Sequence, residues 1–337
     1  MSIVFIHFFA EYKYPINVDI NKVLEKYNLI VYNKITEIIV LLRIKRRIMT
    51  QIRKAVIPAA GFGTRFLPVT KAIPKEMLPI VDTPTLQYVV EEAVKSGITD
   101  ILIILGKNKK CIEDHFDISV ELEQILLRAG KDEYLKQIRD ITNMAHVYYV
   151  RQKEMNGSGM AVLEAEAFVG NEPFAVLYGD DIIYNPEKPC LKQLIEAYDK
   201  TGKIILGCQE VPREEASKYG IVQPGATKGR YSEVIKLVEK PPIDKLPSTI
   251  ASIGRYILTP DIFDVLKNTP AMPNGEVCLT DAIQTIADST GAYAYTFDGR
   301  RYDVGDKLGY IQATIEYGLR DKKLSDGLKA YIKSLDL

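Results

Sequence analysis

The chain has 337 residues, of which 47% are apolar and 26% charged, so it can fill one large α/β core. Its 44 basic and 44 acidic residues cancel. This balance argues against nucleic acid as a partner, because binding to a polyanion depends on an excess of positive charge. The four cysteines are scattered without a Cys-x-x-Cys pair, which predicts neither a disulfide framework nor a zinc site and indicates reduced thiols in a cytosolic protein.

Residues 1–48 differ in sequence pattern from the rest of the chain. The apolar segment 2–10 has no basic residue before it and no small-residue cleavage pattern, so a signal peptide is not indicated. Charges between residues 11 and 37 interrupt any apolar run of spanning length, and no membrane association is expected. Residues 35–48 could form a basic amphipathic helix on a membrane or a partner. We favour Met49 as the natural start, with residues 1–48 a start-site artefact or a poorly ordered extension.

The stretch from Lys54 to Ile80 has the most specific local pattern. Residues 55–57 are apolar and predict a buried strand, which Pro58 is expected to end. A loop of mostly small residues follows, and such residues let backbone N–H groups approach an anion closely. This loop contains Ala59, Ala60, Gly61, Gly63 and Thr64. Arg65 and Lys75 then supply two spaced cations, so the stretch suggests a nucleoside triphosphate site.

The glycines of this loop also permit other interpretations. A Gly-x-Gly after a strand is often only a tight turn. The dinucleotide fingerprint requires a third glycine, where this chain has Phe66, and no Gly-Lys pair is followed by Ser or Thr as a Walker loop requires. The loop is therefore a phosphate cradle of another kind, or only a turn.

From residue 52 the hydrophobic pattern alternates between strands and helices. We expect strands over 100–106, 145–151, 174–177 and 203–207, and helices over 84–97, 108–117, 119–140, 161–169 and 191–200. This alternation predicts a mainly parallel, three-layer α/β sheet in a single domain over residues 49–337.

Beyond Glu210 the elements become shorter. Strands over 219–224, 231–239 and 251–258 predict an antiparallel portion laid over the substrate end of the sheet. A helix over 279–288, a strand over 293–297, a helix over 307–320 and an amphipathic tail from Asp321 are expected to follow.

Two adjacent carboxylates, Asp180 and Asp181, follow the strand predicted over 174–177. Ligands of an open α/β sheet lie beyond the carboxyl ends of its strands. Since neighbouring side chains of a strand point to opposite faces, only one of the two is expected to face a ligand. The alternative is a turn that caps a following helix.

The run A-A-G-F-G-T-R-F-L-P-V-T-K-A-I-P-K-E-M-L-P-I at residues 59–80 resembles the signature of bacterial UTP–glucose-1-phosphate uridylyltransferases, a group of sugar-phosphate nucleotidylyltransferases. The resemblance extends from about Met49 to near the C-terminus. It implies a Rossmann-like nucleotidyltransferase fold with a mainly parallel mixed sheet and a small antiparallel sugar-binding part. It also implies UTP and glucose 1-phosphate as substrates, Mg²⁺ as cofactor, and a homodimer or homotetramer.

The resemblance further implies roles for individual residues. Arg65, Lys75 and Asp180 would be catalytic, and Asp180 and Asp303 would hold Mg²⁺. The nucleotide would contact Ala59, Ala60, Gly61, Gly63, Thr64, Gln152 and Gly157. The amide of Gln152 offers one donor and one acceptor, which suits the edge of uracil. The sugar phosphate would contact Gly179, Tyr219, Gly220, Glu239 and Lys240.

Two positions depart from the family pattern. Met160 replaces the usual His near the nucleotide, and Cys278 replaces the common Gln near the sugar, so base preference, turnover and sugar selectivity could differ. Cys278 has no partner of catalytic type and is not predicted to be a nucleophile. A thymidylyltransferase, another sugar-nucleotide synthase of this fold, or a catalytically weak regulator that binds sugar nucleotides are the alternatives.

Overall fold

The structure is a computed structural model that describes residue 34 and residues 51–335. The chain divides into two units, Met1–Gln51 and Ile52–Leu337. The predicted boundary between residues 48 and 49 and the interpretation of residues 1–48 lie outside the described residues. The second unit holds all the elements discussed below.

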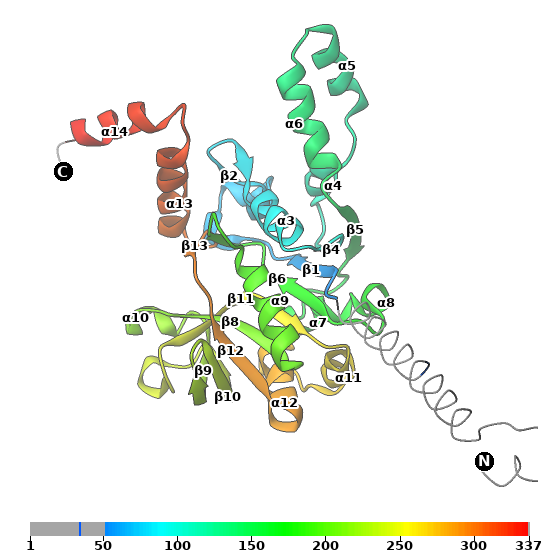
Figure 1. Cartoon of the computed structure of the whole chain (residues 1–337), viewed down its shortest axis with the longest axis vertical. Coiled ribbons are helices and arrows are strands. Elements are labelled where there is room, and N and C mark those ends of the chain that lie inside the picture. The colour runs from blue at the N-terminus through cyan, green and yellow to red at the C-terminus, as the bar shows by residue number, and fades with distance from the viewer. Residues whose placement is uncertain (1–33, 35–50, 336–337) are drawn as a thin grey trace, which may run out of the picture. The chain divides into compact units, whose positions relative to one another are not determined.

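A nine-stranded sheet with the order β5-β4-β1-β6-β11-β8-β12-β10-β9 forms the centre of this unit (Figure 1). The strands are β1 (Lys54–Ala59), β4 (Asp100–Leu105), β5 (His146–Arg151), β6 (Phe174–Leu177), β8 (Ile204–Glu210), β9 (Gly220–Lys228), β10 (Tyr231–Glu239), β11 (Ile250–Leu258) and β12 (Ala292–Thr296). Parallel pairing joins β5, β4, β1 and β6, and also β8 and β12. The other pairs are antiparallel, so the sheet is mixed.

Helices cover both faces of the sheet and complete the three predicted layers. Along β1, Ala55 and Ile57 join one apolar cluster and Val56 joins the other, as the alternation of a doubly covered strand requires. The first cluster includes residues of α3 (Thr85–Lys95), α4 (Lys110–Phe116) and α9 (Cys190–Thr201). The second includes residues of α7 (Ser158–Leu163), α11 (Asp261–Asn268) and α12 (Leu279–Thr290).

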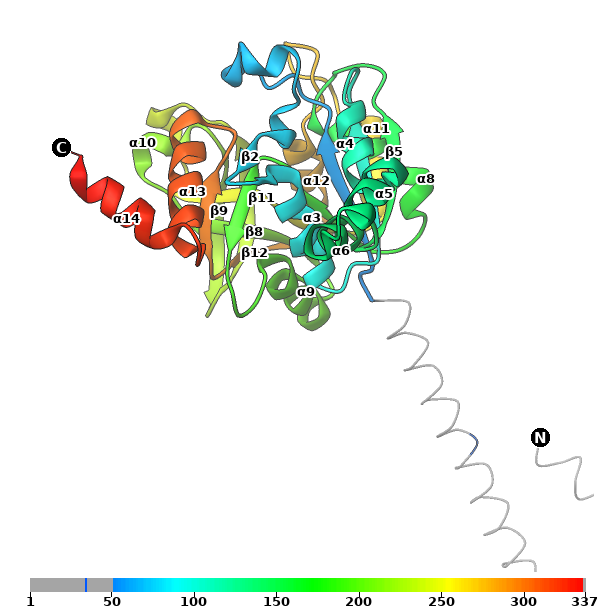
Figure 2. The ribbon, with the colours of Figure 1, turned by 90° about the horizontal axis from the view of Figure 1, so that it is seen from above.

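The remaining elements are short or lie outside the main sheet. They are β2 (Pro79–Ile80), β3 (Thr83–Pro84), α5 (Val120–Arg128), α6 (Asp132–Thr142), α8 (Glu166–Val169), β7 (Asp181–Tyr184), α10 (Arg213–Ala216), β13 (Arg300–Asp303), α13 (Lys307–Arg320) and α14 (Ser325–Ser334). The pair α5 and α6 projects beyond the sheet, and α14 projects beside α13 (Figures 1 and 2). Within the described residues, no helix combines the length and apolar character needed to cross a membrane.

Most predicted elements are confirmed, and the differences have identifiable causes. Pro58 lies inside β1 opposite Ile104 and does not end the strand. A proline is tolerated there because β1 pairs with β6 only at Ala55 and Val56. The residues after Val56 are not paired with β6, so the missing N–H of Pro58 costs no bond of that pairing. The helix expected over 119–140 is divided into α5 and α6, and that over 161–169 into α7 and α8.

The antiparallel part is also placed differently from the prediction. It is not laid over the sheet but continues it: β11 lies between β6 and β8, and β10 and β9 extend the sheet beyond β12. The first residues of β11 also pair with β9, at Ala251 with Ile221 and Ser252 with Gly220, so the sheet curls back on itself.

Four short strands were not predicted. The strands β2 and β3 pair with each other, and β7 and β13 form a second antiparallel pair that sets Asp303 opposite Asp181. A strand that begins at Asp181 therefore follows Asp180, and not the helix that the alternative interpretation would require.

Candidate active site

The small-residue loop follows β1 at the carboxyl end of the central strands. Ala59 and Ala60 are buried, whereas Gly61 and Thr64 are exposed. Gly63 has φ +66°, and a Cβ at this position would lie 3.0 Å from the Cβ of Lys75. The left-handed backbone and this close approach both favour glycine. The loop is thereby packed directly against the turn that carries Lys75.

Lys75 and Asp180 form an ion pair across this end of the sheet, with 2.5 Å between Nζ and Oδ2. Burial acts to lower the pKa of Lys75, but the carboxylates of Asp180 and Glu76 outweigh it, and the pKa is raised. Burial acts to raise the pKa of Asp180, but Lys75 outweighs it, and the pKa is lowered. Both groups are therefore charged at neutral pH.

Asp181, the first residue of β7, points away from this pair. Its Oδ1 accepts a hydrogen bond of 2.6 Å from Nε of Arg301, and its side chain is buried. Of the two adjacent carboxylates, Asp180 is thus the one that faces the loop and Lys75.

Asp303 reaches the same place from β13. Its Oδ2 accepts a 2.9 Å hydrogen bond from the Tyr219 hydroxyl, and its Oδ1 accepts one of 3.1 Å from the Gly305 N–H. A Cβ at Gly305 would lie 2.9 Å from Oδ2 of Asp180 and 3.2 Å from Oδ1 of Asp303. The two carboxylates therefore converge beside this glycine, whose carbonyl oxygen accepts a 3.0 Å hydrogen bond from Arg65.

This pair of carboxylates fits a magnesium ion that arrives with phosphates. Mg²⁺ is usually held by one or two carboxylates, by substrate phosphates and by water. In the part of the chain that the structure describes, no group of three or more His, Cys, Asp or Glu side chains could hold a metal by itself. Asp180 and Asp303 supply the number of protein ligands that a shared protein–nucleotide metal site needs.

The predicted base-binding residues lie beyond the end of β5. The Gln152 side chain is buried, and its Nε2 donates to Oδ1 of Asn156 at 3.3 Å and to the Gly157 carbonyl at 3.4 Å. Gly157 has φ +107°, and a Cβ there would lie 2.5 Å from the carbonyl oxygen of Val277. Met160, in α7, is partly buried and packs against the second apolar cluster.

The predicted sugar-binding residues meet where β9 pairs with β10. Glu239 lies opposite Gly220, and the Lys240 N–H donates to the Tyr219 carbonyl at 3.0 Å. Lys240 also pairs with Oε1 of Glu239 at 3.2 Å, while Thr280 donates to Oε2 at 2.7 Å. Both carboxylate oxygens of Glu239 are therefore held by neighbouring side chains.

Cys278 precedes Thr280 at the start of α12. Its thiol is buried and lies 3.1 Å from the sulfur of Met272. Burial raises the pKa of Cys278 to about 11, so the thiol is protonated at neutral pH. This agrees with the prediction that Cys278 is not a nucleophile. At Gly179, the remaining predicted sugar-phosphate residue, an added Cβ would lie 3.4 Å from Cγ of Glu76.

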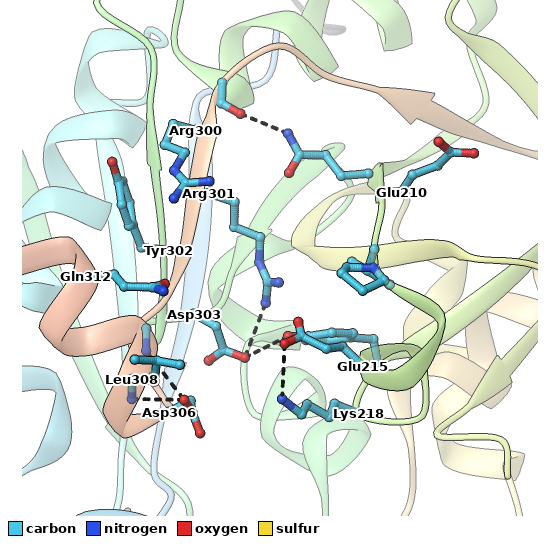
Figure 3. A pocket seen from close by; sticks show the side chains of 16 residues that line it. Glu210, Glu215, Lys218, Arg300, Arg301, Tyr302, Asp303, Asp306, Leu308 and Gln312 are labelled. Carbon is cyan, nitrogen blue, oxygen red and sulfur yellow. Dashed lines mark hydrogen bonds and ion pairs between the residues drawn. The ribbon is translucent and has the colours of Figure 1, made fainter. Parts of the chain in front are cut away.

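A cavity of about 310 Å³ lies beside the Asp180 and Asp303 carboxylates (Figure 3). Asp303 and its hydrogen-bond partner Tyr219 are among the residues that line it. The guanidinium carbon of Arg301 lies 4.5 Å from the centroid of the Tyr219 ring, and Arg301 also pairs with Asp303 at 3.6 Å. Burial raises the pKa of Tyr219 to about 12, so its hydroxyl remains a proton donor to Asp303.

Four residues at this site were not assigned from the sequence. They are Glu76, Lys109, Thr280 and Arg301. Lys109 donates to the loop and to Glu76, Thr280 donates to Glu239, and Arg301 pairs with Asp303. Glu76 lies inside the specific run at residues 59–80, so its position could have marked it as a candidate site residue. Lys109 stands in a charged segment that is typical of a solvated surface.

The chain is similar to known proteins over most of its length. Residues 54–318 match the model of the nucleotidyl transferase family. A UTP–glucose-1-phosphate uridylyltransferase of Staphylococcus epidermidis is 52% identical over 289 residues, which cover 86% of this chain and 100% of the relative. One of Staphylococcus haemolyticus is 53% identical over 287 residues, which cover 85% and 99%.

Solved structures give the same result. A UDP-glucose pyrophosphorylase complexed with UDP-glucose is 46% identical, with a TM-score of 0.75, over 80% of this chain and 100% of that one. A UTP-bound enzyme of the same kind from Acinetobacter baumannii is 38% identical, with a TM-score of 0.79, over 85% and 100%. The chain therefore belongs to the nucleotidyl transferase family and, within it, to the UTP–glucose-1-phosphate uridylyltransferases.

Proposed function

We propose that this enzyme converts UTP and α-D-glucose 1-phosphate to UDP-glucose and diphosphate. The observation that carries the proposal is the convergence of Lys75, Asp180 and Asp303 beside the small-residue loop. The names of the relatives supply the substrates, since they specify UTP and glucose 1-phosphate.

The reaction is an in-line displacement at the α-phosphorus of UTP. An oxygen of the sugar phosphate forms the new bond to this phosphorus, and the bond to the bridging oxygen of the β-phosphate breaks, so that diphosphate leaves with the electron pair. A phosphate monoester has a second pKa of about 6 and is largely dianionic at pH 7. The nucleophile therefore needs no general base, which fits a site without a histidine among the assigned residues.

The side chains act by positioning and by neutralising charge. Lys75 lies against the loop and would contact the α-phosphate, and Arg65, which is exposed beside the loop, would hold the leaving phosphates. The small-residue loop, with Ala59, Ala60, Gly61, Gly63 and Thr64, would contact the nucleotide through backbone N–H groups.

Asp180 and Asp303 are the residues proposed to hold Mg²⁺. When bound, the ion would neutralise the phosphate oxygens of both substrates and draw them together. The hydrogen bonds from Tyr219 and Gly305 keep the Asp303 carboxylate turned toward Asp180.

Substrate recognition is assigned to the two ends of the site. Gln152 and Gly157 would contact uracil, and Gly179, Tyr219, Gly220, Glu239 and Lys240 would contact the sugar phosphate. Glu239, held by Thr280 and Lys240, would accept hydrogen bonds from the glucose hydroxyls.

A labelling experiment tests the reaction and its point of attack. UTP labelled with ³²P at the α-position should place its label in UDP-glucose, whereas UTP labelled at the γ-position should place it in diphosphate. Omission of glucose 1-phosphate is the control. Label from the γ-position in the sugar nucleotide, or no transfer from the α-position, would overturn the proposal.

We also propose that the enzyme is cytoplasmic and acts as a homodimer or homotetramer. Support for self-association comes from α13, where Leu308, Ile311 and Ile315 are exposed on one side of the helix. Light scattering on the purified protein tests this, and a monomer at micromolar concentration would contradict it.

A further inference from the structure

Lys109 is a buried lysine that the proposed mechanism does not use. It lies between β4 and α4, and only 7% of its side chain is exposed. Its ammonium donates to the Ala59 carbonyl, to the Gly61 carbonyl at 2.8 Å and to Oε2 of Glu76 at 2.9 Å. An ammonium has three N–H donors, so these three acceptors use all of its donor capacity.

Two of these acceptors, the carbonyls of Ala59 and Gly61, belong to the backbone of the small-residue loop. In a planar trans peptide, the C=O of one residue and the N–H of the next point in opposite directions. Because the carbonyls of Ala59 and Gly61 are turned toward Lys109, the N–H groups of Ala60 and Phe62 are turned away from it. Neither of these N–H groups forms a hydrogen bond with another described residue. Lys109 thus keeps alternate loop donors available to a ligand.

Glu76 makes a buried cation possible at this place. An unpaired charge in the interior is costly, and Glu76, which is 2% exposed, supplies the counter-charge. Glu76 also belongs to the short turn Lys75–Met77, so the same pair connects the loop to the turn that carries Lys75. The two parts of the proposed phosphate site are thereby fixed relative to each other.

We propose that Lys109, paired with Glu76, is a positioning residue that holds the loop carbonyls away from the nucleotide so that the loop N–H groups bind its phosphates. This inference rests on the proposed function, because it assumes that the loop receives UTP. It predicts that loss of the ammonium weakens UTP binding far more than binding of glucose 1-phosphate.

The test compares the full-length wild type with Lys109→Met, which keeps an unbranched side chain of similar size but removes the donors. Calorimetric titration with UTP and Mg²⁺ gives the affinity, and diphosphate release gives KM for each substrate and kcat. We expect the Kd and KM for UTP to rise about ten- to a hundredfold, the range for losing a hydrogen bond to a charged group. The KM for glucose 1-phosphate should change less than about threefold.

Lys54→Met is the matched control. Like Lys109, Lys54 is a largely buried lysine, but it belongs to β1. Its ammonium donates to the Val169 carbonyl at 3.0 Å and pairs with Glu172 at 3.3 Å. It lies at the opposite end of the strand from the loop. This variant should lose thermal stability without a change in UTP affinity.

A double variant, Lys109→Met with Glu76→Gln, separates positioning from general stability. It leaves no uncompensated charge, so it should be more stable than Lys109→Met and remain folded. UTP affinity should nevertheless stay low, because the donors to the two carbonyls are still missing. Recovery of wild-type UTP affinity in the double variant, or wild-type affinity in folded Lys109→Met, would overturn the inference. Absence of UTP binding and turnover in the wild type would instead refute the proposed function.

Discussion

The ammonium of Lys75 lies 2.5 Å from a carboxylate oxygen of Asp180, although the two residues are 105 positions apart in the sequence. The contact joins a cation suited to phosphate with a carboxylate suited to a metal. In the proposed mechanism, Lys75 would contact a phosphate and Asp180 would hold the metal. The ion pair therefore keeps both groups charged and close to the positions where the reaction would need them.

Removal of either member of this pair should reduce turnover severely. We expect Lys75→Ala and Asp180→Asn each to lower kcat by about 10²–10³, the cost of losing one preorganised electrostatic contact in an active site. Diphosphate release measures turnover, and circular dichroism checks that the variants are folded. Wild-type activity in either folded variant would show that its role is assigned wrongly.

Asp303→Asn should change the metal dependence of the reaction. The amide keeps the shape of the side chain but removes a negative charge that the metal would need. The Mg²⁺ concentration for half-maximal rate should rise at least about tenfold. Asp306→Asn is the control, because Asp306 caps α13 through the Leu308 N–H and Asn caps a helix equally well. An equal Mg²⁺ requirement in wild type and Asp303→Asn would remove Asp303 from the metal site.

Thr280→Val should weaken sugar recognition selectively. The substitution deletes the hydroxyl that holds Oε2 of Glu239 and keeps the shape of the side chain. The KM for glucose 1-phosphate should rise about three- to tenfold, while the KM for UTP stays the same. Thr285→Val makes the same change on the same helix, at a hydroxyl that bonds only its own turn, to the Asp281 carbonyl. Equal effects of the two variants would contradict the role given to Thr280.

Glu316 should contribute to stability in a pH-dependent manner. A hydrogen bond from the Tyr302 hydroxyl and pairing with Arg300 and Arg320 lower the pKa of Glu316 below its usual 4.5. A lowered folded-state pKa means that the stabilisation is present above the unfolded-state pKa and is lost as the pH falls through the folded-state pKa. Glu316→Gln should therefore cost about 1 kcal/mol at pH 7 and progressively less below pH 4.5. Urea unfolding of wild type and Glu316→Gln at pH 7 and below pH 4.5 tests this. A difference in unfolding free energy that does not depend on pH would contradict it.

The sequence predicted the parts of the site that lie in continuous motifs. The loop at residues 59–64, Lys75 and Asp180 could be found because strand, small residues and charged residues follow one another in the chain. That only one of Asp180 and Asp181 faces a ligand stays a prediction. Asp180 pairs with Lys75, whereas Asp181, at the start of β7, contacts Arg301.

The parts that were missed depend on pairing between distant segments. The strand β13 is only four residues long, and its partner β7 lies more than 100 residues earlier, so the contacts of Asp303 and Arg301 have no local pattern. Lys109 looked like a surface residue, because nothing in a charged segment shows that one lysine turns inward to meet Glu76. Pro58 was taken as a strand end, because the local sequence does not show which edge of β1 is left unpaired.

The most direct test of the whole account is diphosphate release by the purified full chain with glucose 1-phosphate and Mg²⁺, comparing UTP with dTTP. We predict rapid release with UTP and little with dTTP, which would make Met160 a tolerated change near the nucleotide. A preference for dTTP would contradict the assigned base specificity. No release with either nucleotide, from folded protein that still binds UDP-glucose, would contradict the assignment as an enzyme.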